Sequence, residues 1–136
     1  LDLRIELRRM ESTLRDEIDR LIPLLDEAKV SRTRLAAAQG VYRSGATVQW
    51  ISNWDEDMQE AVALVNGASA LDVDLTNLSQ IELEARHIAV HRLQGGVSRL
   101  TTKYKESLAA DDKGREELQA NQRMLTHARL GAQDKS

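Results

Sequence analysis

The residues that could hold a metal ion stand close together in one stretch of this sequence. Glu84, His87 and His91 would share one face of a helix, and Glu-x-x-His is a spacing that di-iron helical bundles use. Such a site needs a second Glu-x-x-His pair, but Met124 occupies the position three residues before His127. A zinc site with two histidines and one glutamate is the alternative. Because two histidines one turn apart are common on a solvated helix face, we predict that the chain binds no metal and no cofactor.

Residue patterns for nucleophilic catalysis are missing from the sequence. There is no cysteine and no Gly-x-Ser-x-Gly motif. Gly95-Gly96 lacks the preceding strand and the Lys-Ser/Thr pair of a phosphate-binding loop. Nearly all aspartates and glutamates fall on charged helix faces, so no pair of inward carboxylates stands out. We therefore predict no catalytic residues and no enzymatic activity.

The charge pattern argues against two classes of partner. The chain has 19 Lys+Arg and 22 Asp+Glu with the two signs interspersed, so we predict that it binds no nucleic acid. The longest uncharged runs, residues 44–54 and 61–71, are shorter than the roughly 20 apolar residues that cross a bilayer. Trp50 and Trp54 could anchor a helix at a membrane surface, but the acidic residues that follow them argue against membrane contact. We expect a cytoplasmic protein.

The elements that must position all these residues are helices. No run alternates polar and apolar residues over the length of a strand, and apolar residues recur every three or four positions. In residues 1–45 this stripe comprises Leu3, Leu7, Met10, Leu14, Ile18, Leu21, Leu25 and Ala28. Pro23 interrupts it at a cost of roughly 3 kcal/mol, yet the phase continues beyond. We predict a kinked helix over residues 2–39 that ends before Gly40, with a break at Pro23 as the alternative.

The rest of the chain predicts further helices. A second helix is expected over residues 47–65, closed by Asn66-Gly67. A third begins near Leu75, with Ser79 and Glu82 spaced as a capping box, and is kinked or split at Gly95-Gly96. A turn at residues 111–114 leads into a short last helix that ends at Gly131, followed by a frayed tail, residues 132–136.

These elements predict an all-α fold, an elongated antiparallel three- or four-helix bundle with coiled-coil-like packing. Residues 1–45 would form a leading amphipathic helix and residues 46–131 the bundle. With 136 residues, the chain is long enough for one domain and too short for two. Because it opens on Leu1 inside a charged heptad pattern, we expect a domain excerpted from a longer protein.

Five apolar or aromatic residues are the candidates for contact with a partner. They comprise Leu7, Leu14, Leu21, Trp50 and Trp54. Trp54 is expected in the core and Trp50 half exposed or at a contact. The apolar stripe, rather than any reactive group, would then carry the interaction.

A run of residues from Val48 onward resembles a known repeat. The segment Val48–Ile51 places a tryptophan on a helix, and Trp54–Met58 follows as a small acidic run with apolar spacing. Asp74-Leu75 is an acidic-leucine start to the next helix, with His87 and His91 along it. Over residues 46–130 this pattern is similar to a spectrin-type repeat.

The resemblance implies a role and also shows departures from the family. The last helix carries no tryptophan and would place Met124 there, and Gly95-Gly96 is unusual in a long middle helix. The resemblance implies that residues 1–45 are the last helix of a preceding repeat or a leader packed on the bundle. The implied role is a structural spacer or cytoskeletal linker.

We therefore predict a non-enzymatic helical-bundle scaffold or spacer that mediates protein–protein interaction. Its partner would be another protein or a neighbouring helical domain. The first alternative is a coiled-coil oligomerisation segment, in which residues 1–39 pair with a second copy to form a homodimer. The second alternative is a four-helix sensor or membrane-targeting bundle of a signalling or secreted bacterial protein.

Overall fold

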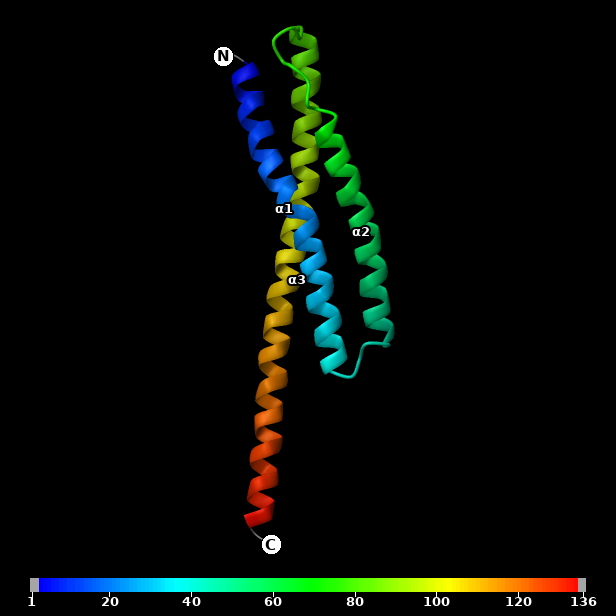
Figure 1. Cartoon of the computed structure of the whole chain (residues 1–136), viewed down its shortest axis with the longest axis vertical. Helices are drawn as coiled ribbons and strands as arrows, with labels where there is room; N and C mark the ends of the chain where they lie inside the picture. The colour runs from blue at the N-terminus through cyan, green and yellow to red at the C-terminus, as the bar shows by residue number, and fades with distance from the viewer. Residues whose placement is uncertain (1–2, 135–136) are drawn as a thin grey trace.

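Three long helices make up the structure. The computed structural model describes residues 3–134, which form α1 (Leu3–Ala38), α2 (Gly45–Ser69) and α3 (Gln80–Asp134), with no strand in that range. α1 and α3 run in the same direction, and α2 runs opposite to both (Figure 1). The prediction of an all-α bundle is confirmed, with three helices rather than four.

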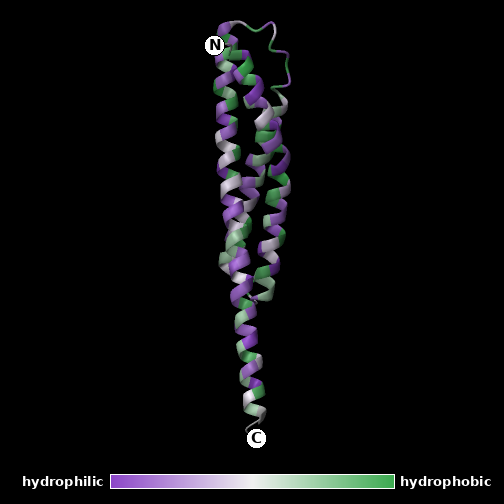
Figure 2. Ribbon diagram, turned by 90° about the vertical axis from the view of Figure 1, so that its left-hand side faces the viewer, coloured by the Kyte–Doolittle hydropathy of each residue, from purple (hydrophilic) through white to green (hydrophobic). Residues whose placement is uncertain are grey.

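The helices pack through residues that recur every seven positions. Figure 2 shows polar and apolar residues interspersed along every helix, as expected for helices with one buried face. In α1 the buried series comprises Leu7, Leu14, Leu21, Ala28 and Leu35. In α2 it comprises Thr47, Trp54 and Ala61, and in α3 Leu83, Val90, Val97, Tyr104 and Asp111. We call these three series together the seam.

Pro23 does not break α1. The helix is continuous from Leu3 to Ala38, so the alternative of a break at this residue is wrong. Pro23 and Asp19 both lie on the exposed face. Water can therefore hydrate the Asp19 carbonyl, which loses its amide partner.

α3 is a single helix through both places where we predicted an interruption. The split at Gly95-Gly96 and the turn at residues 111–114 are wrong. At Gly96 a Cβ atom would lie 2.9 Å from Cδ2 of Leu64, and at Gly114 it would lie 2.9 Å from Cδ2 of Leu35. These two glycines let side chains of α2 and α1 approach the α3 backbone, and packing offsets their low helix propensity.

The capping residues predicted at two helix ends are confirmed. Gly40 has a φ of 73°, and Val41 N donates to Ala36 O at 2.9 Å, which confirms the end of α1 before Gly40. Ser79 and Glu82 form the expected capping box, although α3 begins at Gln80 and not near Leu75.

The predicted end of the second helix at Asn66-Gly67 is wrong. α2 continues to Ser69, and Gly67 lies inside it with an ordinary helical φ. A Cβ atom at Gly67 would lie 3.0 Å from Cδ2 of Leu93 on α3. Gly67 is therefore, like Gly96, a point of close approach between α2 and α3.

The C-terminal part of α3 extends past the other two helices (Figure 1). Gly114 faces Leu35 near the end of α1, and residues 119–132 are all exposed. The helix continues beyond the expected end at Gly131 to Asp134. The rest of the predicted frayed tail, residues 135 and 136, lies outside the described residues.

Candidate interaction sites

A buried carboxylate joins α2 to α3. Oδ2 of Asp57 accepts hydrogen bonds from the Tyr104 hydroxyl at 2.6 Å and from Lys103 Nζ at 2.5 Å. Burial alone would raise the pKa of Asp57, but the hydrogen bonds from Lys103 and Tyr104 outweigh it and lower that pKa. Burial, and then the bond to Asp57, raise the pKa of Tyr104 well above its usual range. Tyr104 therefore stays a neutral donor and is no base or nucleophile at ordinary pH.

Two tryptophans of α2 pack beside this group. The Trp50 and Tyr104 rings meet edge to face with centroids 6.3 Å apart, and the Arg32 guanidinium lies 5.1 Å from the Trp50 centroid. Trp54 is 8% exposed, and its Nε1 donates to the Leu25 carbonyl at 2.7 Å. The tryptophans thus bind α2 to both α1 and α3.

A second buried carboxylate joins α3 to α1. Asp111 is 1% exposed and accepts from Ser31 Oγ at 2.9 Å and from Arg32 Nε at 2.7 Å. Arg115 donates to both the hydroxyl and the carbonyl of Ser31. Each oxygen of the Asp111 carboxylate therefore has a donor from α1, as a charge inside a helical bundle requires.

A third polar contact lies nearer the other end of the bundle. Arg86 Nε donates to Glu11 Oε1 at 2.6 Å between α3 and α1. Its Nη2 atom is buried without a hydrogen-bond partner among the described residues. Gln94 reaches the Met10 carbonyl, and Arg4 donates to the carbonyls of the connection that precedes α3.

The histidines pair without forming a cluster of metal ligands. The His87 and His91 rings are stacked with centroids 6.4 Å apart, and Nε2 of His87 lies 3.4 Å from Oε1 of Glu6. Glu84 instead accepts from Gln80. Within residues 3–134, no group of three or more histidines, aspartates or glutamates is placed to hold a metal ion.

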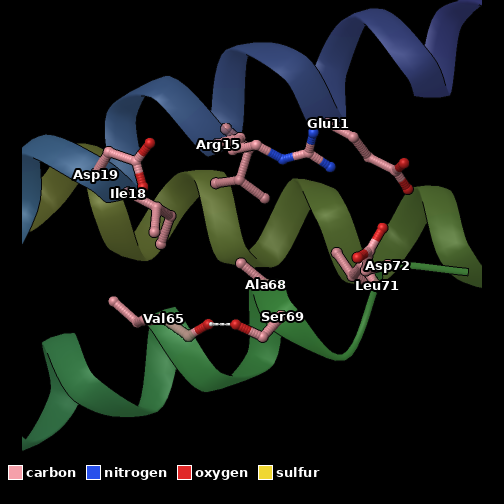
Figure 3. A pocket seen from close by; sticks show the side chains of 10 residues that line it. Glu11, Arg15, Ile18, Asp19, Val65, Ala68, Ser69, Leu71 and Asp72 are labelled. Carbon is pink, nitrogen blue, oxygen red and sulfur yellow. Dashed lines mark hydrogen bonds between the residues drawn. The ribbon is translucent and has the colours of Figure 1, made fainter.

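A shallow groove opens where α2 ends beside α1 (Figure 3). Its volume is about 340 Å³. Ile18, Val65, Ala68 and Leu71 give it apolar walls, while Glu11, Arg15, Asp19 and Asp72 stand around it (Figure 3). Carboxylates and a guanidinium thus stand together around the apolar walls of the groove.

The candidate contact residues lie mostly in the core of this chain. Leu7, Leu14, Leu21 and Trp54 are buried, and only Trp50 keeps partial exposure. The expectation that Trp54 belongs to the core is therefore confirmed. A partner could reach the four buried side chains only if the bundle opened.

Two buried carboxylates escaped the sequence analysis. Asp57 and Asp111 join neighbouring helices, although in the sequence Asp57 belonged to an acidic run and Asp111 to an expected turn. The position of Asp111 could have revealed its burial. Tyr104 and Asp111 follow Val97 at intervals of seven residues, so both fall on the buried face of α3.

Comparisons with known proteins found no relative of this chain. No family model, no curated protein and no solved structure matches the chain. None of the three helices, as far as the chain is described, is long and apolar enough to cross a membrane.

Proposed function

We propose that this chain is a non-enzymatic helical-bundle scaffold or spacer that mediates protein–protein interaction. The observation that carries the proposal is the seam, because the seven-residue recurrence of buried residues joins three long helices into one elongated body. We further propose that the seam packs as a coiled coil does. The reciprocal fit of Leu64 at Gly96 and of Leu93 at Gly67 supports this packing.

The buried charges support the same role. Asp57 and Asp111 bind donors on neighbouring helices, so they act to align the helices with one another. Polar residues at core positions of coiled coils are known to specify register in this way. A defined register is what a spacer needs to hold its two ends at a constant separation.

We also propose that the spacer is of the spectrin type, with a cytoskeletal linker as its setting. The support is the succession of three long helices, with α2 antiparallel to the other two. Residues 46–130, which carry the resemblance, contain all of α2 but its first residue and most of α3, while α1 supplies the third helix of the bundle.

The experiment that tests the spacer measures a distance along α3. The chain has no cysteine, so Glu84→Cys and Gln122→Cys together introduce the only two spin-labelling sites. At about 1.5 Å per residue, 38 residues of unbroken helix separate these positions by about 57 Å. We expect a narrow distance distribution near this value and an elongated monomer in sedimentation velocity.

Other results would overturn the proposal. A broad or much shorter distribution would mean that α3 bends, so that the chain could not hold its ends apart. A compact monomer would favour a sensor bundle, and a concentration-dependent dimer would favour the oligomerisation segment. Either result would refute the spacer proposal in favour of that alternative.

A further inference from the structure

The C-terminal part of α3 carries an apolar face that neither α1 nor α2 covers beyond Leu118. We call residues 118–132 the tail. Met124 is 69% exposed and Leu125 is 59% exposed. The face is made of Leu118, Leu125, Ala128 and Ala132, in which each residue follows the one before by seven, three or four positions, with Met124 beside Leu125 and four positions before Ala128.

This face continues the one that packs inside the bundle. Val97, Tyr104 and Asp111 are each at most 2% exposed, and the next members of this seven-residue series are Leu118, Leu125 and Ala132. α1 ends at Ala38 and α2 begins at Gly45, so both helices stop while the face of α3 continues. The tail therefore presents the surface of a helix–helix interface after its intramolecular partners have ended.

The tail differs from the rest of α3 in its charge. Residues 80–117 contain seven acidic and seven basic residues, whereas the tail contains Arg123, Arg129 and His127 and no carboxylate. Arg129 follows Arg115 by 14 residues, which is two seven-residue repeats. Because Arg115 donates to Ser31 of α1, Arg129 stands on the side of α3 along which α1 would have continued.

We propose that the tail docks an amphipathic helix of a partner protein, whose apolar stripe is flanked by aspartate and glutamate. This inference rests on the proposed function and names the chemistry of the partner that the scaffold would hold. The bundle itself provides a precedent, because α3 supplies the cation and its neighbour the carboxylate in the pairs Arg86–Glu11, Arg99–Glu60 and Lys103–Asp57. The pair Arg32–Asp111 has the reverse arrangement. The acidic flank complements Arg129 in the same way.

Two other occupants fit the tail less well. A second copy whose tail pairs in parallel and in register would bring arginines against arginines, with no carboxylate in either tail to separate them. A membrane surface favours bulky apolar side chains, whereas two of the five residues on this face are alanines. Small residues instead let a second helix approach closely, as Gly96 and Gly67 do between α2 and α3.

The test uses the full chain and two designed peptides as probes. Both peptides carry leucines at the core positions of three heptads, one with glutamate and the other with lysine at the flanking positions. Fluorescence anisotropy measures the binding of each labelled peptide. We expect the glutamate peptide to bind at least about tenfold more tightly than the lysine peptide, and less tightly as salt rises.

Variants locate the binding on the chain. Leu125→Asp should weaken the binding of the glutamate peptide by about tenfold or more, because the substitution puts a charge into the apolar face. Arg129→Glu should shift the preference toward the lysine peptide. The control, Ile88→Asp, alters an apolar side chain of α3 that is 54% exposed and lies outside the tail, so binding should be unchanged. These exposed positions leave the core intact, which circular dichroism checks.

Each contrary outcome identifies what is wrong. Binding of either peptide that Leu125→Asp leaves unchanged overturns the proposal, as does no binding at all. Self-association that Leu125→Asp abolishes would assign the tail to a second copy. Tighter binding to phosphatidylserine–phosphatidylcholine vesicles than to the glutamate peptide would assign it to a membrane. If the measured spin-label distance agrees with the expected one and the glutamate peptide does not bind, the spacer proposal is retained and the docking proposal alone is refuted.

Discussion

Replacing Gly96 with alanine would separate helix propensity from packing, because Gly95 beside it provides a matched control. A Cβ atom at Gly95 would meet nothing within 4 Å, whereas one at Gly96 would lie 2.9 Å from Cδ2 and 3.3 Å from Cδ1 of Leu64. Both substitutions improve helix propensity by about 0.8–1 kcal/mol. Gly95→Ala should therefore raise the free energy of unfolding by about 1 kcal/mol.

Gly96→Ala should not show this gain. Its methyl group must displace Leu64, and overpacking of this kind typically costs about 1–3 kcal/mol. The free energy of unfolding of Gly96→Ala should therefore lie about 1–3 kcal/mol below that of Gly95→Ala. Urea unfolding measures both values, provided that the slope m stays the same in the two variants.

A double-mutant cycle then assigns the cost to Leu64. In a Leu64→Ala background the clash is absent, so Gly96→Ala should recover the full gain of about 1 kcal/mol. Equal stabilisation by Gly95→Ala and Gly96→Ala in the original background would refute the close approach of α2 to α3. A penalty at Gly96 that persists without Leu64 would show that another neighbour causes it.

Further predictions concern the proline and the buried polar groups. Pro23→Ala should raise the free energy of unfolding by about 1–3 kcal/mol, since it restores an amide donor in an exposed turn, and a lower melting temperature would contradict this. Asp111→Ala should lower it by about 3 kcal/mol in urea unfolding, since two donors lose their buried acceptor; a loss below about 1 kcal/mol would be too small for a buried pair. Because the pKa of Tyr104 is higher in the folded chain than the ordinary tyrosine value of 10.0, its contribution to the free energy of unfolding is fully present below pH 10.0. This contribution is lost as the pH rises above 10.0, where the tyrosine of the unfolded chain ionises first. Tyr104→Phe should therefore flatten the alkaline loss of stability, and an unchanged decline would refute the assignment. The lowered pKa of Asp57 contributes stability above its ordinary value of 3.8 that is lost as pH falls, so Asp57→Asn should reduce the acid loss; equal acid sensitivity in the two proteins would count against it.

Signals within a few residues predicted the local structure well. The apolar spacing in residues 3–28 identified α1, and Gly40 and Ser79 marked helix ends that the structure confirms. These signals work because a helix face and a cap are set by residues within one or two turns of each other. The same reasoning placed Trp54 in the core.

Signals that depend on a distant neighbour misled the prediction. Gly67, Gly96 and Gly114 looked like helix ends or breaks, since glycine weakens an isolated helix. Each instead receives a leucine from another helix, and that leucine stands at least 26 residues away in the sequence. Likewise the sequence predicted a turn at Asp111, whereas Asp111 lies inside α3 and accepts hydrogen bonds from Ser31 and Arg32 of α1.

The sequence by itself determined that the chain is helical, where its apolar stripes lie and how several of the helix ends are capped. Only the tertiary structure decided that there are three helices, that α3 runs unbroken through Gly96 and Gly114, and that its tail has no partner within the described chain. The physical reason is that helix propensity and capping are local energies of about 1 kcal/mol, which contacts between distant residues can match or exceed. Those contacts exist only once the helices lie side by side.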